Sequence, residues 1–300
     1  MNATKATMIG LMAVLLWSGI VGLFRRMSEL YGVIGGATLT YTSAAIILIL
    51  INGIPKLSDF SRKYLFWGTV FFVGCEFCLA LSIGYAQNGR QTIEVGMVNY
   101  LWPSLTILST ILFAGKKAKW WIAIGFLLSF VGISWVLGGG LNWKMMGQNI
   151  LANPFSYVAA LCSASSWAAY CTITVKWADG KDATSLFFLV ISILFWVRFY
   201  QSNEPALHFT GSSIIFLLAA GGVLGLGYAV WNIGILYGNV TILAGASYFI
   251  PIFSAIISAY LLDTPLSHDF WLGASMVVAG SIVCWLATLN ADKVKNSVKA

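Results

Sequence analysis

The sequence predicts an all-α membrane protein of ten transmembrane helices, arranged as two inverted-topology repeats of five helices each. Hydrophobic residues make up 59% of the 300-residue chain and charged residues only 9%, against roughly 45–50% and about 25% in soluble proteins. Ten apolar runs alternate with short polar connections, and matching motifs recur in the two halves. A soluble protein is excluded, because so few charges cannot cover a water-exposed surface.

A helix needs about 20 mainly apolar residues to cross the hydrocarbon core of a membrane. Charges and turn residues bound the predicted spans: the first lies between Lys5 and Arg25, the third starts after Lys63, and the fifth starts after Lys119. The five predicted spans of the first half are 6–24, 33–53, 64–85, 92–114 and 120–138.

The second half contains five further spans of the same kind. The sixth starts after Pro154 and ends at Lys176, and the tenth starts after Asp269. Backbone groups in hydrocarbon must pair within one element, so these runs are predicted to be helices. The longest connection is 139–154, which leaves no room for a soluble domain, and residues 1–300 are predicted to form a single membrane domain. The predicted spans of this half are 155–176, 184–200, 213–237, 241–262 and 270–290.

Basic residues predict the orientation, because cytoplasmic connections carry the excess of Lys and Arg. With a cytoplasmic N-terminus, the outer side holds five: Arg25, Arg26, Arg90, Lys144 and Arg198. The inner side holds twelve: Lys5, Lys56, Arg62, Lys63, Lys116, Lys117, Lys119, Lys176, Lys181, Lys293, Lys295 and Lys299. Both termini are therefore predicted to be cytoplasmic.

Three matches in register indicate an internal repeat with halves 1–145 and 150–300. Asn99–Pro103 (NYLWP) matches Ser247–Pro251 (SYFIP), 148 positions on, and Gly125 and Gly132 fall on Gly273 and Gly280 at the same offset. In the first and sixth spans, Trp17 matches Trp167 and Arg26 matches Lys176, at an offset of 150. Five spans per copy is an odd number, so the second copy must be inverted, a construction that transporters use for alternating access.

The two matched prolines, Pro103 and Pro251, mark candidate helix kinks at membrane depth. A proline leaves the carbonyl four residues earlier without its helical donor. Those residues are Asn99 and Ser247. A freed carbonyl beside a polar side chain suits a cavity that receives a hydrophilic group. The alternative is a kink whose carbonyl is satisfied by a neighbouring helix.

Glu76 is the one acid well inside a predicted span, whereas Glu94 is expected at the membrane interface. An intramembrane carboxylate is costly and marks a candidate binding or proton-linked site. Its expected partner is a substrate ammonium group or a proton. The alternative is a structural, hydrogen-bonded glutamate.

Aromatic residues at mid-depth form the second group of candidate binding residues. Facing a cavity, they would offer flat apolar walls with polar tips, suited to aromatic solutes and to cation–π contacts. Facing lipid, they would be packing residues. The strongest candidates are Trp102, beside the kink, and Trp167, a member of a matched pair; the others are Tyr100, Tyr248, Trp17 and Trp231.

Catalysis has little support in the sequence. His208 and His268 fall in connections, and no acid–histidine–nucleophile arrangement or metal-ligand spacing occurs. We therefore expect no enzyme, no cofactor and no metal. The basic residues are scattered between apolar runs, so nucleic acid is not an expected partner. A membrane enzyme acting on lipid-linked substrates and a structural subunit are the rival classes.

Several stretches resemble the drug/metabolite transporter superfamily with its EamA-type repeats and, more narrowly, its bacterial exporters of aromatic amino acids. They are KATMIGLMAVLLWS (5–18), EVGMVNYLWPSLTIL (94–108), WAAYCTIT (167–174) and WNIGILYGNVT (231–241).

The resemblance implies an inner-membrane exporter of aromatic and other neutral amino acids, with Trp102 and Trp167 in a central cavity. It also admits organic cations such as methyl viologen. Nucleotide sugars are a less favoured cargo, because no basic residue lies at mid-depth. The preferred amino acid, proton coupling and oligomeric state stay open. The expected substrate-binding residues are Trp102, Trp167, Asn99, Tyr100, Ser247, Tyr248 and Glu76.

Overall fold

The computed structural model describes residues 2–115 and 117–297, and every regular element within them is a helix. One is a short 3₁₀ helix, η1 (Leu57–Asp59), and the rest are α-helices. The α-helices are α1 (Ala3–Ser18), α2 (Ile20–Tyr31), α3 (Val33–Asn52), α4 (Arg62–Gly84), α5 (Gly89–Asn99), α6 (Trp102–Ala114), α7 (Ile122–Gly138), α8 (Trp143–Ala152), α9 (Pro154–Trp177), α10 (Thr184–Gln201), α11 (Gly211–Tyr237), α12 (Val240–Ser247), α13 (Ile250–Leu261) and α14 (His268–Ser297).

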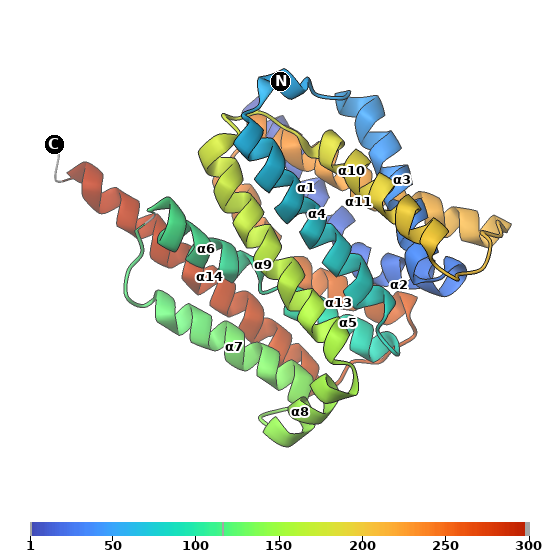
Figure 1. Cartoon of the computed structure of the whole chain (residues 1–300). Helices are drawn as coiled ribbons and strands as arrows, with labels where there is room; N and C mark the ends of the chain where they lie inside the picture. The colour runs from blue at the N-terminus through green and yellow to red at the C-terminus, as the bar shows by residue number, and fades with distance from the viewer. Residues whose placement is uncertain (1, 116, 298–300) are drawn as a thin grey trace.

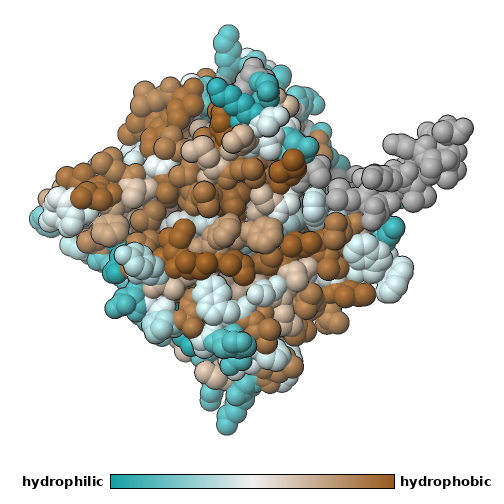
Figure 2. Space-filling model, turned by 180° about the vertical axis from the view of Figure 1, so that it is seen from behind, coloured by the Kyte–Doolittle hydropathy of each residue, from teal (hydrophilic) through white to brown (hydrophobic). Residues whose placement is uncertain are grey.

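The prediction of an all-α membrane protein is confirmed. Among the described residues, eight segments are long and apolar enough to cross a membrane, and ten if two bent helix pairs each count as one span. The bent pairs are α1 with α2, at 42°, and α7 with α8, at 72°. Figure 2 shows a broad hydrophobic band across the molecule, with hydrophilic residues gathered above and below it, as a membrane-spanning bundle requires.

Two sequence predictions need correction. The first span was expected to end at residue 24, but the chain bends at Gly19 and continues as helix α2 to Tyr31. Residues 139–154 were expected only to connect two spans, but most of them form helix α8. The side chain of Asn142 accepts a hydrogen bond from the Met145 N–H and so caps the first turn of α8.

Local sequence signals explain where several spans begin. Ser61 accepts a hydrogen bond from the Tyr64 N–H at the start of α4, and Thr210 forms a capping box with Ser213 at the start of α11. Helix α9 combines a capping side chain, Asn153, with Pro154 in its first turn, where the missing proline N–H costs nothing. These caps satisfy N–H groups that no helical carbonyl can reach.

The fourth and ninth spans are each interrupted just before the matched prolines. Helix α5 ends at Asn99 and α6 begins at Trp102, while α12 ends at Ser247 and α13 begins at Ile250. Gly89–Phe113 and Ile242–Leu261 are each still long and apolar enough to count as one span. The two interruptions fall at repeat-matched positions, so the helix breaks come from the sequence motif itself.

Helices α7 and α14 run side by side at one edge of the bundle (Figure 1), and their backbones touch at four glycines. A Cβ on Gly125 would lie 2.7 Å from the Gly280 carbonyl oxygen, and one on Gly132 would lie 2.7 Å from that of Gly273. Because the residue numbers of the two helices rise in opposite directions along the contact, the helices are antiparallel. The pairs are reciprocal at the 148-residue offset, as an inverted repeat requires.

Candidate functional site

A cavity lies at mid-depth in the bundle and widens toward one end. Its deep part has a volume of about 80 Å³, and its wide part, of about 570 Å³, reaches the connection between α9 and α10. The two parts share four lining residues, Trp17, Trp102, Trp167 and Tyr228, so they adjoin each other at these rings. The wide part falls within the range of roughly 300–1,000 Å³ that small-molecule pockets occupy.

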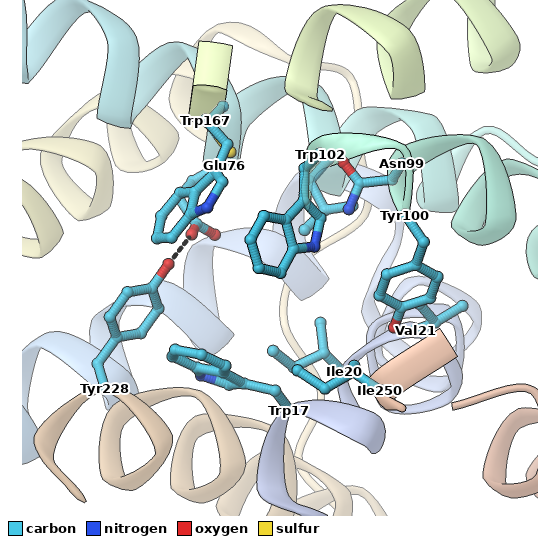
Figure 3. Close-up of a pocket in the computed structure, with 12 residues that line it drawn as sticks. Trp17, Ile20, Val21, Glu76, Asn99, Tyr100, Trp102, Trp167, Tyr228 and Ile250 are labelled. Carbon is cyan, nitrogen blue, oxygen red and sulfur yellow. Dashed lines mark hydrogen bonds between the residues drawn. The ribbon is translucent and has the colours of Figure 1, made fainter. Parts of the chain in front are cut away.

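Five aromatic residues line the deep part of the cavity (Figure 3), and four of them, Trp17, Trp102, Trp167 and Tyr228, contact one another. The rings of Trp102 and Trp167 meet edge to face with centroids 6.1 Å apart. Trp167 also contacts Tyr228 edge to face at 6.1 Å, and Tyr228 contacts Trp17 at 5.0 Å. Rings held in this way offer a rigid, flat, apolar surface to a planar solute.

Glu76 of α4 lies at the wall of the same cavity and is only 3% exposed. Its Oε2 accepts a hydrogen bond from the Tyr41 hydroxyl at 2.8 Å, and its Oε1 accepts one from the Tyr228 hydroxyl at 2.7 Å. Among the residues that the structure describes, no Lys or Arg lines the deep part. The two tyrosines satisfy the carboxyl group without supplying a positive charge, which leaves it able to take a cation or a proton.

The structure brings five of the predicted site residues to the deep part of the cavity: Glu76, Asn99, Tyr100, Trp102 and Trp167. The other two do not line it in this conformation. The Ser247 hydroxyl donates a hydrogen bond to the Ala244 carbonyl of its own helix, and the Tyr248 ring packs against Trp285.

Sequence reasoning missed Tyr41 and Tyr228 as partners of Glu76. They lie 35 and 152 positions from it in the chain, on α3 and α11, and no motif links the three residues. Sequence reasoning also gave no sign that Glu94, expected near the membrane interface, has partners inside the bundle. Glu94 is 3% exposed, pairs with Arg90 at 2.9 Å and accepts a hydrogen bond from the Tyr157 hydroxyl at 2.7 Å.

The bundle end where the cavity opens, here called the cavity end, carries Lys181 and Asp182. The Asp182 carboxylate bridges two elements there, because it accepts hydrogen bonds from the Thr184 hydroxyl and from the Asn232 amide. These contacts fix the connection between α9 and α10 against α11 at the rim of the cavity.

The opposite end, here called the sealed end, is closed by side chains. Arg26 of α2 donates to the Leu261 carbonyl at the end of α13, and Arg25 donates to the carbonyl of Ala86 just after α4. Below them, α2 packs against α5, where Val21 contacts Gly96. Guanidinium groups placed on the last carbonyls of helices satisfy groups that lack an intrahelical donor.

Comparisons with known proteins agree with this architecture. A model of the EamA-like transporter family matches residues 154–286. The aromatic amino acid exporter YddG of Salmonella typhimurium (strain 14028s / SGSC 2262) is 48% identical over 290 residues, covering 96% of this chain and 99% of the exporter. The exporter of the same name from Escherichia coli (strain K12) is 49% identical over the same shares of both chains.

A more distant YddG exporter, from Ancylobacter novellus, is 25% identical over 95% of this chain and 99% of its own length. One solved crystal structure of a protein has the same fold, with a TM-score of 0.67 and 22% identity over 97% of this chain and 99% of that one. The sequence resemblance stated above is confirmed. The chain belongs to the EamA-like transporter family, whose members are transporters and not enzymes.

Proposed function

We propose that this protein exports aromatic and other neutral amino acids from the cytoplasm by alternating access. The observation that carries the proposal is one cavity at mid-depth that combines five aromatic rings with a buried carboxyl group. Its near full-length relatives are exporters of aromatic amino acids. The chemistry of the cavity matches the chemistry of such a solute, which has an aromatic ring and an ammonium group.

Each part of the solute has a partner in the cavity. Trp102 and Trp167 provide the apolar wall for the ring, and the Glu76 carboxylate receives the ammonium group. Asn99 and Tyr100 lie on the lining and supply polar atoms for the carboxylate head of the amino acid. Ser247 and Tyr248, their repeat mates, belong to the proposed site in a second conformation.

Orientation and location follow from the basic residues. The cavity end lies on the side of the bundle to which the twelve inner Lys and Arg residues are assigned, because Lys181 and the Asp59 connection meet there. We therefore infer that the structure is open to the cytoplasm and that both termini are cytoplasmic. A bacterial exporter of this kind works in the inner membrane, where the amino acid gradient arises.

The repeats 1–145 and 150–300 together form the single transport domain.

Organic cations are a second candidate cargo, and the same site favours them. A carboxylate flanked by aromatic faces attracts a cation through charge and through the ring quadrupoles. Nucleotide sugars are disfavoured, because phosphate binding needs Lys or Arg, and neither is found in the deep lining within the described part of the chain.

Flux of labelled Phe in proteoliposomes tests the proposed function. We expect Phe uptake well above that of protein-free vesicles, inhibited by excess unlabelled Tyr or Trp and unaffected by a nucleotide sugar. Inhibition by an aromatic organic cation would extend the cargo to cations. Phe flux equal to that of protein-free vesicles would refute amino acid transport.

A further inference from the structure

The first and ninth spans are tied to each other at both ends of the bundle. At the cavity end, the Thr7 hydroxyl of α1 accepts a hydrogen bond from the Asn239 N–H, just before α12, at 2.8 Å. At the sealed end, Arg26 Nε donates to the Leu261 carbonyl at 2.9 Å. A helix pair held at both ends moves as one body more easily than it separates.

The sixth and fourth spans are tied in the same way, at the opposite ends. The Tyr157 hydroxyl of α9 donates to Glu94 of α5 at the sealed end, and the Lys176 ammonium group donates to the Phe113 carbonyl of α6 at the cavity end. At the 150-residue offset, Tyr157 is the repeat mate of Thr7, and Lys176 is the repeat mate of Arg26. At the 148-residue offset, Phe113 is the repeat mate of Leu261. The remaining partners, Glu94 and Asn239, are not mates, so the two tied pairs correspond in three of their four contacting residues.

One contact breaks this symmetry. Between the first and fourth spans, a Cβ on Gly96 would lie 3.8 Å from the Val21 Cβ, so the two helices touch and close the sealed end. The repeat mates of these residues are Cys171 of α9 and Ala244 of α12. Val21 and Gly96 are buried, whereas Cys171 and Ala244 are partly exposed, and Cys171 lines the wide part of the cavity. Among the described residues, α9 is not one of the helices packed closely against α12.

We propose that Val21 and Gly96 form one gate of the transporter, that Cys171 and Ala244 form the other, and that the two tied helix pairs move as rigid bodies between them. The proposal rests on the alternating access proposed above. When the Val21–Gly96 contact opens, the Cys171–Ala244 contact closes the cavity end. Ser247 and Tyr248 then take the places at the cavity that Asn99 and Tyr100 hold in this structure.

The residue types at both gates suit an exchange of this kind. Val21, Gly96, Cys171 and Ala244 are small and carry no charge, so neither contact requires an ion pair to break when it opens. The Arg26–Leu261, Tyr157–Glu94 and Lys176–Phe113 contacts lie within the tied pairs and need not change. The Arg25 hydrogen bond to the Ala86 carbonyl lies outside both tied pairs, at the sealed end. Two states that differ mainly in apolar contacts of similar size can lie close in free energy, which lets a bound solute shift the population.

Paired cysteines test the gates and the tied pairs separately. Val21→Cys with Gly96→Cys places two Cβ atoms near the mean disulfide spacing of about 3.8 Å. Cys171 is native, so the second gate needs only Ala244→Cys. Thr7→Cys with Asn239→Cys, linked by a short bifunctional methanethiosulfonate, joins a tied pair. Copper phenanthroline oxidises the gate pairs, and peptide mass spectrometry identifies which cysteines have joined.

We expect the Val21–Gly96 disulfide to form in the substrate-free protein and to abolish Phe flux until it is reduced. The Cys171–Ala244→Cys disulfide should form several-fold faster during turnover than without substrate, and should also abolish flux reversibly. The Thr7–Asn239 link should leave flux unchanged. Oxidised wild-type protein and each single-cysteine variant are the controls.

Three results would overturn the proposal: flux that continues through a closed Val21–Gly96 disulfide, no Cys171–Ala244→Cys disulfide during turnover, or flux blocked by the Thr7–Asn239 link. The result is separable from the proposed function. If labelled Phe is not transported at all, the proposed substrate is wrong. The rate of disulfide formation in the substrate-free protein still shows whether Val21 and Gly96 are in contact while Cys171 and Ala244 are apart.

Discussion

The indole rings of Trp102 and Trp167 meet edge to face inside the cavity, with an interplanar angle of 77°. The two residues come from the fourth and sixth spans, which the Tyr157–Glu94 and Lys176–Phe113 contacts hold together. The corner that they form therefore belongs to one of the two helix pairs proposed above to move as rigid bodies. A solute ring placed in it contacts two faces at once.

Truncating either ring should weaken Phe binding. We expect Trp102→Ala and Trp167→Ala each to raise the Phe concentration for half-maximal flux by about tenfold or more, since loss of a buried aromatic anchor typically costs about 2 kcal/mol or more. Flux measured against Phe concentration in proteoliposomes checks this. Trp120→Ala, at a residue 81% exposed, is the matched control and should behave as wild type. Wild-type flux in both cavity variants would remove these rings from the site.

Removing the charge of Glu76 should impair transport more than removing one of its hydrogen bonds. Glu76→Gln keeps the shape of the side chain but cannot attract an ammonium group, and charge-assisted hydrogen bonds are worth about 1.5–3 kcal/mol. We expect Phe flux to fall about tenfold or more, with a smaller loss for Tyr228→Phe. Initial rates with and without a pH gradient provide the measurement. A gradient dependence that disappears in Glu76→Gln would assign proton coupling to this carboxyl group.

The control for Glu76 is Asp179→Asn, which removes a carboxylate from an exposed connection. Its flux should match that of the wild type. If Glu76→Gln also matches the wild type in rate and in pH-gradient dependence, Glu76 is a structural residue.

The close approach of α7 and α14 should make Gly280 intolerant of any side chain. A Cβ there would lie 2.5 Å from the Gly125 carbonyl oxygen and 2.6 Å from the Ser129 nitrogen, so the backbones must separate. We expect Gly280→Ala to destabilise the protein by about 1–3 kcal/mol, as overpacking does. Thermal unfolding in detergent measures the loss. Gly222→Ala, where a Cβ meets nothing within 4 Å, should lower stability little or not at all, and equal unfolding temperatures for the two would contradict the contact.

The Tyr157–Glu94 hydrogen bond should stabilise the fold, because it satisfies a carboxylate that is buried between α5 and α9. Tyr157→Phe leaves one carboxylate oxygen without this donor, at a cost of about 1–3 kcal/mol. The unfolding temperature of detergent-solubilised protein should therefore fall. Tyr200→Phe, on a residue 80% exposed, serves as the comparison and should not change it. An unchanged unfolding temperature in Tyr157→Phe would show that the hydrogen bond adds nothing.

The helices were predictable because hydrophobic run length reports directly on membrane spans. The sequence also marked Gly125, Gly132, Gly273 and Gly280 as repeat mates, and the structure brings these four together. The bend at Gly19 was not predictable, since a single glycine in an apolar run is compatible with a straight helix. Helix α8 was missed because its ten residues are too few and too polar to read as a span.

The cavity was predictable only in part. Glu76, Asn99 and Trp102 carry local signals: an acid at membrane depth, and a polar and an aromatic residue beside a proline. Tyr41 and Tyr228 carry none, because a tyrosine in an apolar helix is equally suited to packing, and only the fold shows that its hydroxyl reaches Glu76. Ser247 and Tyr248 share the signals of Asn99 and Tyr100, but in this conformation the Ser247 hydroxyl donates to the Ala244 carbonyl and the Tyr248 ring packs against Trp285.

The glycine contact between α7 and α14 is self-complementary: each half of the chain presents the same surface to the other. Contacts of this kind join identical subunits in symmetric dimers, where no covalent link is needed. The peptide bonds between residues 139 and 142 are then dispensable for recognition of one half by the other. Two separately translated fragments, 1–140 and 141–300, should find each other in the membrane and reconstitute one working transporter.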